Sequence, residues 1–279
     1  MAASRVGPSN PNVRDGFDPL VPIQVGTTLP FFCIHGAGGN VLNFRDLATR
    51  LGTDQTFYGI QAAGVDGGAA LETIEEMAAL YLPSVLSVQS EGPYVIGGYS
   101  AGGVVAYELV QQLSRSGKKV ALLVLLDTFA ADVIPRRTHA KTHFKGLTRN
   151  GPMYLANRVK ARLQRETDSL SVSLKTRFYR SQNQPIPFEL RDAYMSTALG
   201  EAALKYRPIP YAGKVTLYRA TEVDPQFRHT GEKLGWGALT PNMEVVHVPG
   251  NHDTLVYEPN VHVMISHLRK SLDSILCGA

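Results

Sequence analysis

The distribution of apolar residues along the chain predicts strands that alternate with helices. Short apolar runs typical of buried strands occupy residues 31–34, 56–60, 94–97, 120–126, 214–220 and 243–248. The run 120–126 is apolar at every position, which is typical of a parallel strand covered on both faces. After several of these runs the apolar residues recur at helical spacing, as in residues 104–113 and 264–275. The pattern predicts an α/β fold with a doubly wound, mostly parallel sheet.

Residues 128–212 interrupt this alternation. They are rich in Lys and Arg, have moderately amphipathic helical spacing, and are divided by prolines. We interpret residues 130–205 as a helical lid, inserted over a site at the carboxyl ends of the strands. Residues 1–19 are rich in Pro, Gly, Asn and Ser, which predicts a flexible leader or linker. The folded domain is expected to span residues 20–279.

The composition is ordinary for a globular protein, with 279 residues of which 44% are hydrophobic. The longest apolar run is far shorter than the roughly 20 residues that cross a bilayer, and no signal-peptide segment is present. We therefore expect a soluble, cytoplasmic protein with no membrane contact. Cys33 and Cys277 provide neither a disulfide framework nor a four-cysteine zinc site. His139 and His143 lack the Glu of a zinc-binding helix, so we expect no metal and no bound cofactor.

Positive charge is concentrated in one part of the chain. The formal net charge is +4, yet residues 132–180 contain twelve Lys or Arg against three acids. Such a segment suits an acidic protein, a phosphate-bearing substrate or nucleic acid, or it is simply a solvated helical face. No RNP, KH, zinc-finger or basic-zipper pattern accompanies it, so we expect no nucleic-acid partner.

Residues 98–102, Gly-Tyr-Ser-Ala-Gly, supply the clearest candidate for chemistry. They fit the G-x-S-x-G pattern, in which a serine occupies a strained turn and the two glycines avoid collisions across it. A strand-like run precedes Ser100, and a helical pattern follows it as far as Ser116, where Gly117 suits a helix C-terminus. Ser100 is therefore predicted to be a nucleophile on a strand-turn-helix.

A serine nucleophile needs a base to take its proton and an acid to orient that base. His252 is the one histidine placed in a loop between a predicted strand and the last helix, so we predict that it is the base. Two acids follow Ser100 in the required order. Asp127 directly ends a strand and is the preferred acid, while Asp224 follows the next strand and stays possible.

The glycine-rich loop after residues 31–34 has three interpretations. A dinucleotide fingerprint that begins at Gly36 would need glycine at position 41, which is Val41. An oxyanion loop would use these glycines to aim a backbone N–H at the site, and an ordinary βα turn would have no catalytic part. We prefer the oxyanion loop, with His35 supporting it.

Together these motifs resemble the thioesterase domains that end nonribosomal peptide synthetases and polyketide synthases. The resemblance runs from about Leu20 to Leu276 and rests on residues 34–40, 97–103, 125–128 and 249–252, with further similarity at 206–208 and 234–236. It implies an α/β-hydrolase fold with a lid, favours Asp127 as the acid, and implies a substrate held as a thioester on the phosphopantetheine arm of an acyl or peptidyl carrier protein. No carrier domain precedes it here, which leaves open a free-standing protein or an excised domain.

On this basis Ser100 is expected to attack the thioester while the backbone N–H groups of Ala37 and Ala101 hold the oxyanion. Water would then release a linear acid, and an internal hydroxyl or amine would release a lactone or lactam. The alternatives are an editing thioesterase that clears stalled carriers, a general carboxylesterase, and a non-catalytic acyl-binding module.

Overall fold

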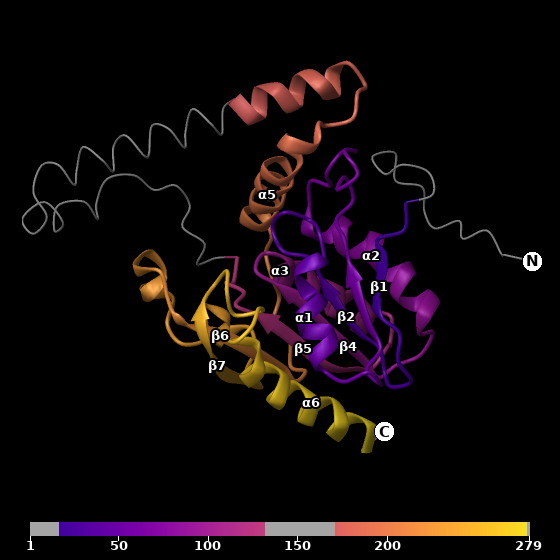
Figure 1. Cartoon of the computed structure of the whole chain (residues 1–279), viewed down its shortest axis with the longest axis vertical. Helices are drawn as coiled ribbons and strands as arrows, with labels where there is room; N and C mark the ends of the chain where they lie inside the picture. Colours follow the sequence, from indigo (N-terminus) through magenta and orange to yellow (C-terminus); the bar gives the residue numbers. More distant parts are fainter. Residues whose placement is uncertain (1–16, 132–170, 278–279) are drawn as a thin grey trace, which may run out of the picture.

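The computed structural model describes residues 17–131 and 171–277 and contains a seven-stranded sheet in the order β1-β3-β2-β4-β5-β6-β7 (Figure 1). The strands are β1 Leu20–Gln24, β2 Phe31–Ile34, β3 Phe57–Ile60, β4 Tyr94–Tyr99, β5 Val120–Leu126, β6 Val215–Glu222 and β7 Met243–Asn251. All neighbouring strands are parallel except β1, which runs antiparallel to β3. The predicted fold class is confirmed. Strand β1 was not predicted, because its residues are partly buried or exposed and such an edge strand leaves no strong apolar signal.

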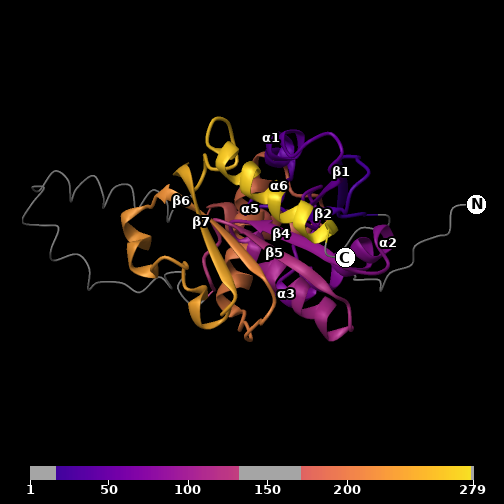
Figure 2. The same cartoon turned by 90° about the horizontal axis from the view of Figure 1, so that it is seen from below.

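Helices cover both faces of this sheet. The helices are α1 Arg45–Arg50, α2 Ile74–Val88, α3 Gly102–Arg115, α5 Phe188–Lys205 and α6 Val261–Cys277, with 3₁₀ turns at Leu42–Phe44, Pro225–Thr230 and Trp236–Ala238. Helices α1 and α6 pack on one face and α2 and α3 on the other (Figure 2). None of the described helices is both long and apolar enough to cross a membrane.

The two-sided core explains why the central strands are apolar throughout. In β2, Phe32 and Ile34 join the core under α2 and α3, while Phe31 and Cys33 join the core under α1 and α6. All four side chains are fully buried. Full burial of one such side chain stabilises the fold by roughly 1.5–3 kcal/mol, so both faces of each central strand favour apolar residues.

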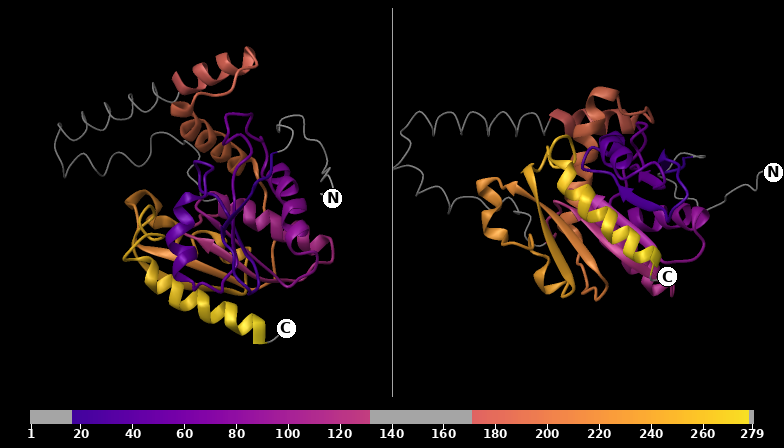
Figure 3. Two further views of the ribbon diagram at one scale, coloured as in Figure 1. Left: turned by 45° about the vertical axis from the view of Figure 1, so that its right-hand side comes forward. Right: turned by 60° about the horizontal axis from the view of Figure 1, so that its bottom comes forward.

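The described part of the insertion between β5 and β6 lies at one end of the molecule (Figures 1 and 3). It consists of helical residues 171–181 and α5; residues 132–170 of the predicted lid, with His139 and His143, lie outside the described residues, as do residues 1–16 of the predicted leader. Leu199 of α5 joins the core under α2 and α3. Met195 packs with Ala62 and lies against the glycine loop after β2. Helix α5 therefore covers the loop expected to border the site.

Candidate active site

Ser100 occupies a strained turn between β4 and α3. Its φ of 55° lies in the left-handed region, which is uncommon for a residue with a side chain. A Cβ on Gly98 would lie 2.4 Å from the Gly102 carbonyl oxygen, and one on Gly102 would lie 1.8 Å from the His35 carbonyl oxygen. The two glycines therefore let the backbone close tightly around Ser100, as the motif predicts, and they bring α3 against the loop after β2.

The three predicted side chains lie together in one hydrogen-bonded row. His252, in the turn between β7 and α6, places Nε2 2.8 Å from Ser100 Oγ and Nδ1 2.7 Å from Asp127 Oδ2. A carboxylate only accepts, so Nδ1 carries the ring proton and Nε2 is free to accept the serine proton. This arrangement can activate Ser100 for attack on an acyl carbon and can stabilise the imidazolium that results.

The structure distinguishes between the two acids that the sequence left open. The carboxylate in contact with His252 is that of Asp127, whose other oxygen accepts the Ala220 backbone N–H at 2.9 Å. Only 6% of the Asp127 side chain is exposed, against 37% of His252. The acid is thus enclosed and held at two points, while the imidazole faces an accessible space. Asp224 lies beyond the end of β6 and does not make this contact.

Tyr99 holds His252 in place, a role that was not predicted from the sequence. Its ring stacks on the imidazole, with centroids 5.4 Å apart and planes at 20°. Its hydroxyl donates to the His252 backbone carbonyl at 2.7 Å. Tyr99 is the variable residue before the serine in G-x-S-x-G, so the motif alone carries no signal for this role.

The segment after Asp127 is held by the turn around Trp236. The buried Trp236 indole donates to the Thr128 carbonyl at 2.9 Å, and the Ala130 N–H donates to the Leu234 carbonyl at 2.9 Å. These bonds tie the first residues after β5 to the turn around Trp236, so the strand end that carries Asp127 is anchored.

The two predicted oxyanion donors lie on the loops that Gly102 brings together. Among the described residues, neither the Ala37 nor the Ala101 N–H takes part in a backbone–backbone hydrogen bond outside the regular elements. Both residues are partly exposed. Backbone N–H groups on two adjoining loops beside a serine are the kind of donor that an oxyanion hole uses.

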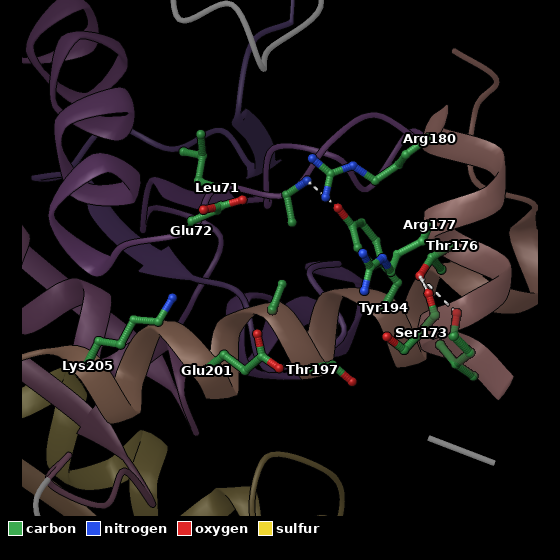
Figure 4. Close-up of a pocket in the computed structure, with 13 residues that line it drawn as sticks. Leu71, Glu72, Ser173, Thr176, Arg177, Arg180, Tyr194, Thr197, Glu201 and Lys205 are labelled. Atoms are coloured by element: carbon green, nitrogen blue, oxygen red, sulfur yellow. Dashed lines mark hydrogen bonds between the residues drawn. The ribbon is translucent and has the colours of Figure 1, made fainter. Parts of the chain in front are cut away.

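A groove of about 230 Å³ opens between α5, helical residues 171–181 and the loop before α2 (Figure 4). Arg177 and Arg180 extend into it from one side and Lys205 from α5, with Glu72 and Glu201 between them. Within the described part of the chain, no ion pair shorter than 4.0 Å involves these three cations. Among the described residues that line the groove, three cations thus outnumber two carboxylates, and this positive balance suits an anionic group.

No group of three side chains able to hold a metal ion occurs in residues 17–131 and 171–277. In a row such as Ser100, His252 and Asp127, an imidazole alone can activate the hydroxyl.

The sequence matches the family described as thioesterase domain over residues 29–272. It is 27% identical over 265 residues to inactive atromentin synthetase invA6 of Paxillus involutus, covering 87% of this chain and 27% of that protein. It is 30% identical over 259 residues to malpinin synthetase of Mortierella alpina, covering 91% of this chain and 3% of that protein. The chain thus spans only a small part of these two relatives. Among solved structures, the NocB thioesterase domain in covalent complex with a fluorophosphonate nocardicin G analogue superposes with a TM-score of 0.64 at 23% identity, covering 91% of this chain and 100% of that one.

Proposed function

The chain belongs to the thioesterase domain family, and we propose that it releases an acyl, polyketide or peptidyl chain from a carrier-protein phosphopantetheine thioester through an ester on Ser100. Membership of this family makes it a hydrolase. The observation that carries the proposal is the hydrogen-bonded row of Asp127, His252 and Ser100, in which a strained serine faces an accessible imidazole. The relatives are synthetases much longer than this chain, which supports a substrate delivered by a carrier.

In the first step Ser100 Oγ attacks the thioester carbonyl carbon while His252 Nε2 takes the hydroxyl proton. The carbonyl oxygen becomes an oxyanion, which the Ala37 and Ala101 N–H groups stabilise. One such donor is typically worth ~10²–10³ in rate. The carbon–sulfur bond then breaks, and the imidazolium returns the proton to the departing thiolate. The product is an acyl ester of Ser100.

In the second step His252 removes a proton from the incoming nucleophile, which attacks the ester carbonyl carbon. The bond from that carbon to Ser100 Oγ then breaks, and the imidazolium returns the proton to Oγ. Water gives a linear acid, and a hydroxyl or amine of the acyl chain itself gives a lactone or lactam. Asp127 stabilises the imidazolium in both steps through its 2.7 Å contact with Nδ1. Helix α5, which covers the loop after β2, would limit the entry of water.

The proposal is tested by intact-mass spectrometry with a panel of acyl N-acetylcysteamine thioesters. The wild type should gain the mass of the acyl group and then release linear or cyclic product. The Ser100→Ala variant should gain nothing. A fluorophosphonate, the reagent class bound in the NocB complex, should label the wild type alone. If the wild type forms neither an acyl adduct nor a fluorophosphonate adduct, the covalent mechanism is wrong.

The groove in Figure 4 supports the carrier part of the proposal. A phosphopantetheine arm carries a phosphate, and Arg177, Arg180 and Lys205 line one groove without an ion pair to another described residue. A thioester with the phosphate should therefore have a higher kcat/KM than its N-acetylcysteamine counterpart. High salt should reduce the difference, since these side chains face solvent.

The double variant Arg177→Gln, Arg180→Gln isolates this contact. Its kcat/KM for the phosphopantetheine thioester should fall by about tenfold, as expected for the loss of roughly 1.4 kcal/mol of charge-assisted binding, with little change for the N-acetylcysteamine thioester. Lys175→Gln is the matched control, because Lys175 lies on the same helical segment but does not line the groove. Equal effects on both substrates would contradict the phosphate contact without contradicting the thioesterase mechanism.

A further inference from the structure

A buried histidine and a buried tyrosine lie behind the glycine loop, and the mechanism above uses neither of them. His35 and Tyr81 are each 1% exposed. The Tyr81 hydroxyl, on α2, lies 3.0 Å from His35 Nε2, and His35 Nδ1 lies 2.6 Å from the Gly36 carbonyl oxygen. Two buried polar side chains connected in this way form a continuous path from α2 to the loop.

The chemistry of the groups sets the direction of these hydrogen bonds. A carbonyl oxygen only accepts, so His35 Nδ1 carries a proton and donates it. Burial lowers the pKa of His35 to about 4, so the ring is neutral near pH 7 and Nε2 accepts. Burial raises the pKa of Tyr81, so its phenol keeps the proton that it donates to Nε2. The path runs in one direction, from Tyr81 through His35 to Gly36.

The Gly36 carbonyl belongs to the same peptide group as the Ala37 N–H. That carbonyl accepts two hydrogen bonds, one from His35 Nδ1 at 2.6 Å and one from the Gly39 N–H at 3.0 Å. Two bonds to the oxygen fix the plane of the peptide and therefore the direction of its N–H. They also draw electron density toward the oxygen, which makes the N–H a stronger donor, because hydrogen bonds in a chain strengthen one another.

We propose that Tyr81 and His35 are positioning residues that orient and polarise the Gly36–Ala37 peptide, so that the Ala37 N–H binds the oxyanion more strongly. This inference rests on the proposed function, in which that N–H is an oxyanion donor. The gain falls in the transition state, where the substrate oxygen carries charge, and is small in the ground state. Loss of polarisation should therefore cost part of the ~10²–10³ that a whole donor supplies, on the order of three- to tenfold.

The test compares Tyr81→Phe with the wild type on an acyl N-acetylcysteamine thioester and on the matching trifluoromethyl ketone. The ketone adds to a serine hydroxyl and places a charged oxygen in the oxyanion hole. Tyr81→Phe should lower kcat by about three- to tenfold at constant KM, and should raise the Ki of the ketone by the same factor. In a His35→Asn background, which interrupts the path, Tyr81→Phe should have no further effect on kcat.

Tyr107→Phe is the matched control, since Tyr107 is also fully buried and donates its hydroxyl to the Ile209 carbonyl at 2.6 Å. Both Phe variants should lose a similar amount of stability in urea, and Tyr107→Phe should keep the wild-type kcat and Ki. The inference is overturned if Tyr81→Phe leaves the ketone Ki unchanged or lowers kcat no more than Tyr107→Phe. It is also overturned if the effects of Tyr81→Phe and His35→Asn are additive. A wild type that neither turns over the thioester nor binds the ketone would instead refute the proposed function.

Discussion

The close packing of Gly102 against the loop after β2 predicts that a single added methyl group disables the site. A Cβ at this position would lie 1.8 Å from the His35 carbonyl oxygen, and Cβ atoms essentially never approach such an atom within 3.0 Å. The Cβ is fixed to the backbone of α3 and the oxygen belongs to the backbone of the loop, so the contact cannot be relieved by rotation of a side chain. In Gly102→Ala either α3 or the loop must therefore move by at least about 1.2 Å, the difference between those two distances.

Two costs follow from this movement. Overpacking of this kind typically destabilises a protein by about 1–3 kcal/mol, which exceeds the ~1 kcal/mol that alanine gains over glycine in a helix. The movement also separates the loop that carries Ala37 from the turn that carries Ser100, and a misplacement of about 1 Å can reduce the rate by about 10²-fold. We expect Gly102→Ala to unfold at lower urea concentration and to lose about 10²-fold in kcat.

Gly200→Ala is the control for glycine replacement in a helix. Gly200 lies within α5, and a Cβ there would meet no atom within 4 Å. This variant should be more stable by about 0.5–1 kcal/mol and should keep its activity. The assays are urea denaturation and steady-state turnover of an acyl N-acetylcysteamine thioester. If Gly102→Ala matched Gly200→Ala in both assays, the close approach of α3 to the loop would not be what assembles the site.

Three further predictions concern the pH dependence of stability, the support of the base, and a buried carboxylate. Burial lowers the pKa of His35 from 6.5 to about 4, so between these pH values the unfolded chain binds a proton that the native ring does not. Stability should fall as the pH drops through this window, by at most about 3.4 kcal/mol, and urea denaturation of His35→Gln should lack this component. Tyr99→Leu removes the ring stack and the hydroxyl bond to the His252 carbonyl, and it should lower kcat by about tenfold or more. Tyr99→Phe keeps the ring and should lose less kcat. Equal losses of kcat in steady-state kinetics would contradict the role of stacking. Glu108→Gln should cost about 1–3 kcal/mol in urea denaturation, because the buried carboxylate pairs with Arg115 at 2.6 Å and accepts from the Tyr206 hydroxyl at 2.8 Å; unchanged stability would show that this network is replaceable.

Features that depend on local patterns could be predicted from the sequence. The central strands can be recognised as apolar runs because helices cover both of their faces. The turn at Ser100 can be recognised from its glycines, because the close approach of backbone segments there leaves no room for a Cβ. His252 could be selected because the order of strand, loop and helix placed it past a strand end. Only a few residues on either side are needed for each of these inferences.

Features that depend on which strands become neighbours could not be decided in the same way. Asp127 and Asp224 both follow strands after Ser100. Only in the folded chain does one of them, Asp127, contact His252, while its other carboxylate oxygen accepts the Ala220 N–H. The edge strand β1 could not be predicted either, because it pairs with β3 through backbone groups that every residue carries.

The sequence by itself determined the α/β alternation, the serine turn and the candidate base, since each is recorded in the spacing of residues close together in the chain. Only the tertiary structure decided that Asp127 meets His252, that Tyr99 stacks on His252, and that Tyr81 reaches His35 across 46 positions of sequence. The physical reason is that hydrogen bonds and ring contacts form over about 3–6 Å of space, and a linear sequence does not record those distances until the sheet order is set.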